Sequence, residues 1–151
     1  IPRLVDMKIQ PFLTAAVLNS VLAQRLVRRI HTDCVESYAA SEETLEKELT
    51  DAEITDLKEF FSPELFKKNR TFWKAPGCKA CGETGYLGRI GIHEVMDIND
   101  EIRQMVMRRA NAGEIKVAAV RGGMTSMLQD GFQKAVSGVT TLEEVLRVFH
   151  E

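Results

Sequence analysis

Three cysteines and one histidine form two pairs with the spacing of metal ligands. Cys78 and Cys81 are separated by two residues, and His31 and Cys34 repeat that spacing. Two ligands at this spacing can reach one ion from a tight turn, and the four together would complete a tetrahedron with no open position. A closed site of this kind is structural rather than catalytic. We therefore predict about one structural zinc ion per chain, with Cys34 better supported as a ligand than His31.

Two other interpretations of these residues stay open at this point. A single Cys-x-x-Cys pair can be a redox centre, and a histidine near a cysteine is often only a surface residue, although a second pair at the same spacing favours a metal. An odd number of cysteines also argues against a disulfide framework, and thiols at metal spacing indicate a reducing compartment. His93 and His150 have no partners in the sequence and define no site. We expect Trp73 to pack near the cysteine turn.

Composition narrows the function classes. The chain has 151 residues and is 44% hydrophobic, so it can bury a sizeable core. Its net charge of −2 argues against a protein that binds nucleic acid by neutralising phosphates. Residues 31–70 carry eleven acidic and five basic side chains, and for the acidic run at residues 41–70 we favour a solvated face over a docking surface. The apolar stretch at residues 12–23 is too short to span a bilayer, and we expect a cytoplasmic protein. Because the sequence begins without Met, we expect it to be cut from a longer one.

The elements that must position these residues follow from periodicity and capping signals. We predict a buried helix from Pro11 to near Gln24, then a strand at residues 25–30, for which a continued helix is the alternative. Residues 41–70 are predicted helical, with a capping box at Thr50 and Glu53 and a second helix start at Ser62–Pro63. The remaining predictions are strands at residues 70–74 and 89–98 and helices that begin at Asn99, Thr125 and Thr141, the last with Glu144 completing its capping box.

The segment around the second cysteine pair, Gly77 to Glu94, closely resembles the type II secretion and type IV pilus-assembly ATPases. Other stretches agree in order, and only residues 38–72 lie outside the resemblance. These stretches are Arg3–Met7, Pro11–Leu13, Leu22–Arg29, Asp130–Gly131 and Gly138–Val148. The family pattern has a cysteine where His31 stands, and imidazole is a competent zinc ligand in its place.

The resemblance implies an α+β fold, mostly helical, with four parts. Residues 1–30 would end a RecA-like motor core, and residues 31–88 would form a small zinc-binding module with an acidic helical insertion. Residues 89–98 would be a strand returning to the core, and residues 99–151 a C-terminal helical bundle.

The resemblance also implies a parent protein that is a homo-hexameric ATPase using ATP and Mg, peripheral to the inner membrane through an integral platform protein. The family's phosphate-binding loop is not in this sequence. We therefore assign no catalytic or nucleotide-binding residue and expect no activity from this chain alone. The alternative class is a free-standing zinc-ribbon adaptor for protein partners. A chaperone-type cysteine repeat would need several Cys-x-x-Cys-x-Gly-x-Gly units, and the spacing of Gly82 and Gly85 differs from that.

Overall fold

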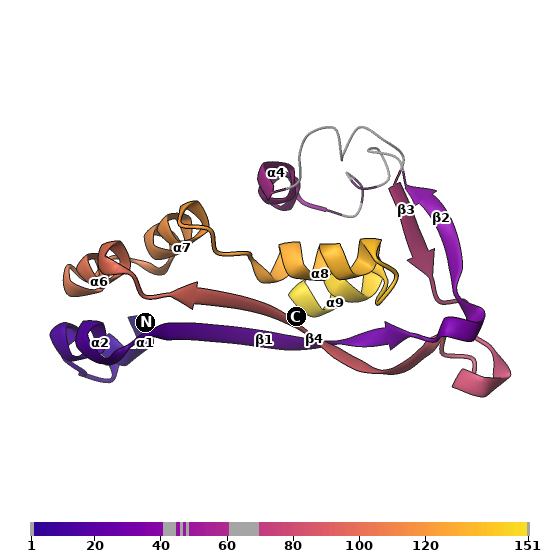
Figure 1. Cartoon of the computed structure of the whole chain (residues 1–151), viewed down its shortest axis with the longest axis horizontal. Helices are drawn as coiled ribbons and strands as arrows, with labels where there is room; N and C mark the ends of the chain where they lie inside the picture. Colours follow the sequence, from indigo (N-terminus) through magenta and orange to yellow (C-terminus); the bar gives the residue numbers. More distant parts are fainter. Residues whose placement is uncertain (1, 41–44, 46, 48, 61–69, 151) are drawn as a thin grey trace. The chain divides into compact units, whose positions relative to one another are not determined.

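The computed structural model describes residues 2–40, 45, 47, 49–60 and 70–150. Helices and strands are mixed along the chain, which confirms the α+β class (Figure 1). The elements are α1 (Pro2–Asp6), α2 (Pro11–Val17), β1 (Ser20–Ile30), η1 (Thr32–Cys34), β2 (Glu36–Ala40), α4 (Asp51–Phe60), β3 (Arg70–Lys74), η2 (Lys79–Cys81), β4 (Tyr86–Asp97), α6 (Asp100–Met107), α7 (Ala112–Arg121), α8 (Met127–Val136) and α9 (Leu142–His150). Within the described part of the chain, no helix has the length and apolar character needed to cross a membrane.

The chain divides into two compact units, each made of two stretches of sequence. The first unit is Ile1–Ala23 with Glu94–Ser126, and the second is Gln24–His93 with Met127–Glu151. In the first unit, Asn99 caps α6 as predicted, because its side chain accepts a 2.9 Å hydrogen bond from the backbone N–H of Ile102. The unit's core is apolar and comes mainly from α6 and α7. It consists of Ala15, Ile98, Ile102, Met105, Val106, Ile115, Ala118 and Ala119.

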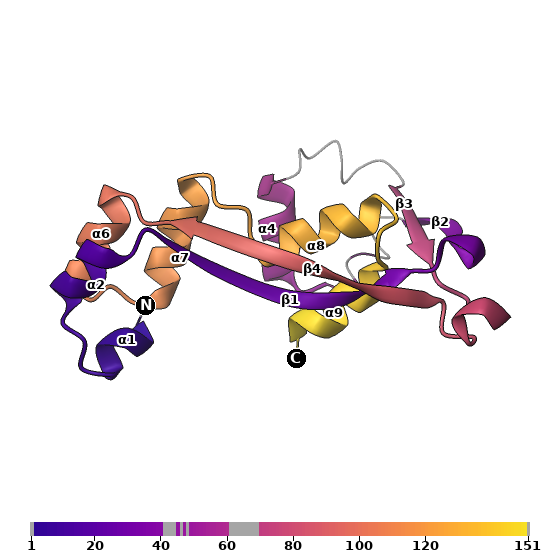
Figure 2. The ribbon, with the colours of Figure 1, turned by 60° about the horizontal axis from the view of Figure 1, so that its bottom comes forward.

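The second unit contains two strand pairs and helices, and the strands of one pair, β1 and β4, also extend into the first unit. β1 pairs with β4, and the two strands run in opposite directions (Figure 1 and Figure 2). β2 and β3 form an antiparallel pair, in which Glu36 faces Lys74 and Ala40 faces Arg70. The core lies among this second pair, α4, α8 and α9. Its buried residues are Ala40, Leu45, Leu49, Ile54, Leu57, Phe72, Leu128, Phe132, Ala135, Leu142, Val145 and Leu146.

The predicted helix from Pro11 is wrong in length and in burial. α2 ends at Val17, and the chain is extended from Ser20, well before Gln24. The carbonyl of Asn19 accepts a 2.9 Å hydrogen bond from the N–H of Ile98, at the point where the partner strand ends. Pairing with β4 therefore overrides the helical periodicity of this stretch. The helix is also not buried on most sides, since Val17 is 71% exposed.

The predicted strand at 25–30 is confirmed as part of β1, and the continued helix is wrong. The strand at 70–74 matches β3, and the one predicted at 89–98 lies within β4 apart from its last residue. The capping box of α4 is also present, with the Thr50 N–H donating to Glu53 over 2.7 Å. The helix start predicted at Ser62–Pro63 lies outside the described residues.

Candidate metal centre

Strand pairing brings the two predicted ligand pairs to the same end of one ladder. His31 and Cys34 lie in the turn that follows β1, and Cys78 and Cys81 lie in the turn that precedes β4. Since β1 and β4 are paired, the end of one strand lies beside the start of the other. The N–H of His31 donates to the carbonyl of Gly85 over 2.9 Å, which fixes the two turns against each other.

The cysteine turn depends on glycines with left-handed backbone angles. Gly77 has φ 98° and Gly85 has φ 76°. A Cβ at Gly77 would lie 2.5 Å from the carbonyl oxygen of Glu83, and one at Gly85 would overlap the carbonyl of Ala75. These two positions need glycine both for the backbone angle and for space.

The four predicted ligand atoms lie within 4.8 Å of one another. Zinc bonds of about 2.3 Å to sulfur and about 2.0–2.1 Å to nitrogen give tetrahedral edges of about 3.8 Å between sulfurs and about 3.6 Å between sulfur and nitrogen. The Sγ of Cys81 is 3.7 Å from that of Cys78 and 3.9 Å from that of Cys34. The Nδ1 of His31 is 3.5 Å from the Sγ of Cys34 and 3.5 Å from the Sγ of Cys78. The group therefore has the size of a zinc tetrahedron and could hold a metal ion.

The sulfurs are not joined by disulfides, because a disulfide bond is about 2 Å long and all three cysteines are free. Burial raises the pKa of the Cys81 thiol, but N–H donors from Cys78 and Gly85, each 3.2 Å from its sulfur, outweigh it and lower the pKa to about 6. At Cys34, burial and the neighbouring thiols raise the pKa to about 11. The backbone thus favours one thiolate in particular, and a bound cation would favour the others.

His31 is positioned as a ligand by its surroundings. The residue is only 7% exposed, and its Nδ1 faces two cysteines. Its other ring nitrogen, Nε2, lies 3.8 Å from a carboxylate oxygen of Asp33. A metal-bound histidine commonly directs its second nitrogen at an oxygen acceptor, which sets the tautomer. Asp33 was not singled out from the sequence, although its place between the two ligands was a usable signal.

A buried carboxylate that pairs with two arginines was missed by the sequence prediction. Thr141 does cap α9, since its hydroxyl accepts from the N–H of Glu144 over 3.2 Å. The carboxylate of Glu144, however, does not return to the cap. It binds the guanidinium groups of Arg28, at 2.7 Å, and Arg147, at 2.8 Å, and its side chain has no exposed area. Together these bonds lower the pKa of Glu144 to about 2, against the opposing effect of burial. The capping box predicted at this helix is therefore only half formed, because Arg28 and Arg147 take its acidic member.

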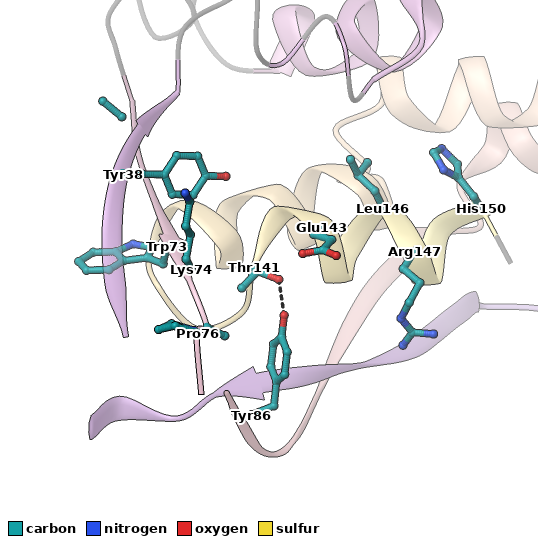
Figure 3. Close-up of a pocket in the computed structure, with 12 residues that line it drawn as sticks. Tyr38, Trp73, Lys74, Pro76, Tyr86, Thr141, Glu143, Leu146, Arg147 and His150 are labelled. Carbon is teal, nitrogen blue, oxygen red and sulfur yellow. Dashed lines mark hydrogen bonds between the residues drawn. The ribbon is translucent and has the colours of Figure 1, made fainter. Parts of the chain in front are cut away.

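Tyr86 links the cysteine turn to this ion pair. Its hydroxyl is 2.9 Å from that of Thr141 (Figure 3), and the guanidinium of Arg28 lies over its ring at 4.1 Å from the centroid. The residue that follows the turn is thus held by both β1 and α9. No sequence signal within the turn predicts these contacts.

The other residues considered from the sequence have structural partners. The N–H of His93 donates to Asp130 over 2.8 Å, and His150 pairs with Glu53 at 2.8 Å. The indole N–H of Trp73 donates to the carbonyl of Val136 over 3.1 Å, at the end of α8. Among the described residues, His31, Cys34, Cys78 and Cys81 are the only group of His, Cys, Asp or Glu side chains placed to share a metal.

Comparison with known proteins identifies the family of this chain. The sequence model of a family described as "Type II/IV secretion system protein" matches residues 1–147. The chain belongs to this family. The type II secretion system protein E of Xanthomonas campestris is 43% identical over 148 residues, which are 98% of this chain and 24% of that protein. The type IV pilus assembly ATPase PilB of Thermus thermophilus is 42% identical over 147 residues, 97% of this chain and 15% of that protein.

A third relative, the type II secretion system ATPase E of Vibrio cholerae, is 37% identical over 152 alignment positions, which cover 100% of this chain and 27% of that protein. The chain therefore spans only 15–27% of the length of these relatives. The resemblance to secretion and pilus-assembly ATPases that the sequence suggested is confirmed as family membership.

Proposed function

We propose that this chain is the C-terminal part of a secretion or pilus-assembly motor ATPase and that a structural zinc ion staples its cysteine module. Family membership over residues 1–147 supports the motor assignment. The observation that carries the zinc assignment is the spacing of the three sulfurs and one nitrogen, which lie within 4.8 Å of one another and are 3.5–3.9 Å apart along four of the six edges, as suits a zinc tetrahedron. No observation favours the free-standing adaptor.

The need for a staple follows from where the hydrophobic core lies. No residue in 31–39 or 73–91, all of which the structure describes, is a buried hydrophobic residue. The two turns must therefore be held by something other than apolar packing. A structural zinc ion supplies folding free energy directly in modules too small for a core. With four protein ligands it leaves no position for a substrate, so the ion's role is structural.

This chain would contribute four parts to the full-length motor. Residues 1–30 would end the RecA-like core, 31–88 form the zinc module with its acidic insertion, 89–98 return to the core and 99–151 form the C-terminal helical subdomain. In the full-length protein, ATP with Mg would be hydrolysed by residues outside this chain. The protein would act in the cytoplasm as a homo-hexamer that meets an inner-membrane platform protein.

Cobalt substitution tests the ligand set without depending on motor activity. The chain loaded with Co²⁺ should show the intense visible bands of tetrahedral cobalt and sulfur-to-cobalt charge transfer. His31→Cys should keep tetrahedral bands and shift them with the added thiolate, whereas His31→Ala should weaken affinity by roughly 10–100-fold or more, as loss of a ligand or its support does. Spectra of octahedral cobalt in water, unchanged by these substitutions, would refute the site.

The motor assignment has a separate test in the full-length protein. Replacing Cys78 and Cys81 by serine should reduce secretion or pilus assembly, because the module loses its staple. Serine at Gly88, a position of β4 where an added Cβ has no neighbour within 4 Å, serves as a control for changes in this segment. Normal secretion or pilus assembly by the cysteine variant would show that the motor does not need the zinc module. It would not affect the interpretation of the cobalt spectra.

A further inference from the structure

Four arginines converge on one depression of about 540 Å³ in the second unit. Arg25 and Arg28 come from β1, Arg89 from β4 and Arg147 from α9. Among the described residues of its lining, Glu144 is the one acidic residue, and Leu26 and Val148 are apolar. This described lining carries four positive charges and one negative charge, a net charge of +3.

The arginines outnumber the acidic groups of the described lining. The carboxylate of Glu144 is shared between Arg28 and Arg147, and both guanidinium side chains remain nearly half exposed, at 44% and 47%. Arg25 donates to the carbonyls of Val148 and Phe149 at the end of α9, which carry no net charge.

Arg89 is exposed, and its side chain makes no hydrogen bond or ion pair with any residue that the structure describes. A cluster of like charges held in this way costs free energy unless an anion approaches it.

A second depression, of about 920 Å³, shares Arg147 with the first. Its lining includes the rings of Tyr38 and Tyr86 together with Pro76 and Leu146 (Figure 3). Lys74 also lines it, with its ammonium 4.9 Å from the centre of the Tyr38 ring. The two depressions therefore offer an arginine-rich part next to an aromatic and apolar part that is bordered by Lys74, Arg147 and one acidic residue, Glu143.

We propose that the two depressions together bind an acidic, extended segment of a partner protein. Its carboxylates would pair with the arginines, and its apolar side chains would lie against Tyr38, Tyr86 and Leu146. Glu144 shows that Arg28 and Arg147 already hold a carboxylate at 2.7–2.8 Å, the geometry in which arginine recognises such groups. The charge of the surface and the mixed chemistry of the two depressions set the partner's composition.

A peptide fits this surface better than a free phosphate or nucleotide. Phosphate sites commonly use backbone N–H groups at a helix N-terminus. Here the C-terminal carbonyls of α9 lie at the arginine depression instead, and this end of a helix carries partial negative charge. A phosphate would also leave the aromatic depression unused.

Fluorescence anisotropy with a labelled twelve-residue peptide of four Glu-Glu-Leu repeats tests the proposal. Binding should weaken with salt, with Gln in place of the Glu residues of the peptide, and with Ser in place of its Leu residues. Arg89→Gln should raise Kd roughly five- to tenfold, as the loss of a charge at an interface rim does. Arg29→Gln, the neighbour of Arg28 on β1 and not part of either lining, should change it less than about twofold.

Several results would overturn the proposal. Equal effects of the two arginine variants, or tight binding of the Gln peptide, would show that the site does not recognise carboxylates. Displacement of the peptide by inorganic phosphate, with no preference for its Leu residues, would make this a phosphate site. Binding to phosphatidylglycerol vesicles that Arg89→Gln abolishes, without peptide binding, would make it a membrane contact. Self-association lost in Arg89→Gln, by sedimentation, would make it a contact between copies of this chain. Thermal unfolding of each variant verifies that its fold is unchanged.

Discussion

Replacing Glu144 by glutamine should destabilise the chain by about 2 kcal/mol at neutral pH, with a characteristic dependence on pH. The carboxylate accepts hydrogen bonds from the side chains of Arg28 and Arg147 and from the backbone N–H of Arg28, at 3.1 Å. Glutamine keeps the size of the side chain. It removes the charge and places an NH₂ group where an acceptor is needed, and a buried polar group without its partner costs about 1–3 kcal/mol.

The magnitude follows from the pKa of this carboxyl group. Its displacement from the ordinary value of 4.5 to about 2 corresponds to about 3.5 kcal/mol, at about 1.4 kcal/mol per pKa unit. Water screens part of this attraction, because both guanidinium groups are nearly half exposed. We therefore expect about 2 kcal/mol, which is less than the 3–5 kcal/mol typical of a broken buried ion pair.

The pH dependence has a definite direction. The folded chain holds this pKa below its unfolded value, so the stabilisation is complete above pH 4.5 and disappears as the pH falls towards 2. The difference in unfolding free energy between wild type and Glu144→Gln should shrink over the same range. Taking this difference cancels the acid sensitivity of the cysteine centre, which both proteins share.

Urea unfolding followed by circular dichroism between pH 3 and pH 7 measures this difference. Glu143→Gln is a matched control, because Glu143 is the exposed neighbour on the same helix turn, and it should cost less than about 0.5 kcal/mol. Equal stability of the two variants at pH 7, or a Glu144→Gln deficit that stays constant down to pH 3, would refute the role assigned to this ion pair.

Three further predictions concern the turn, the ligand and the core. Gly85→Ala should cost roughly 2–4 kcal/mol of unfolding free energy, since its Cβ would overlap a backbone carbonyl. Gly88→Ala, at a similar φ but with no neighbour within 4 Å, should cost only about 1 kcal/mol. His31→Ala should unfold at lower temperature in metal buffer but match wild type in excess chelator, and equal loss in both conditions would contradict a ligand role. Phe72→Ala should cost about 3–5 kcal/mol by chemical denaturation, because this ring is 0% exposed, whereas Phe12→Ala, 55% exposed, should cost below about 1 kcal/mol.

The features that could be predicted from the sequence are those set by neighbours along the chain. Thr50 and Asn99 cap the helices that follow them because their partners lie three residues away. The pairing of Cys78 with Cys81 also rests on local spacing, and the structure brings His31 and Cys34 to it. Their role as ligands stays a prediction that cobalt spectra and metal analysis can test.

Features set by distant contacts could not be predicted. The helical periodicity after Pro11 continues past Val17, yet pairing with β4 turns the chain into a strand. Glu144 has the spacing of a capping residue, but Arg28, 116 positions away, takes its carboxylate. The arginines of the depression come together from two strands and a helix only because β1 pairs with β4. Their spacing in the sequence does not predict this.

The most direct test of the central claim is the metal content and thiol reactivity of the purified chain. The account predicts about one zinc ion per chain by elemental mass spectrometry, with the three thiols protected from Ellman's reagent until a chelator removes the ion. After the chelator is added, zinc release and thiol reaction should proceed together, with three reactive thiols appearing for each zinc ion released. A chain without bound metal, even after incubation with zinc, and with all three thiols freely reactive would contradict it.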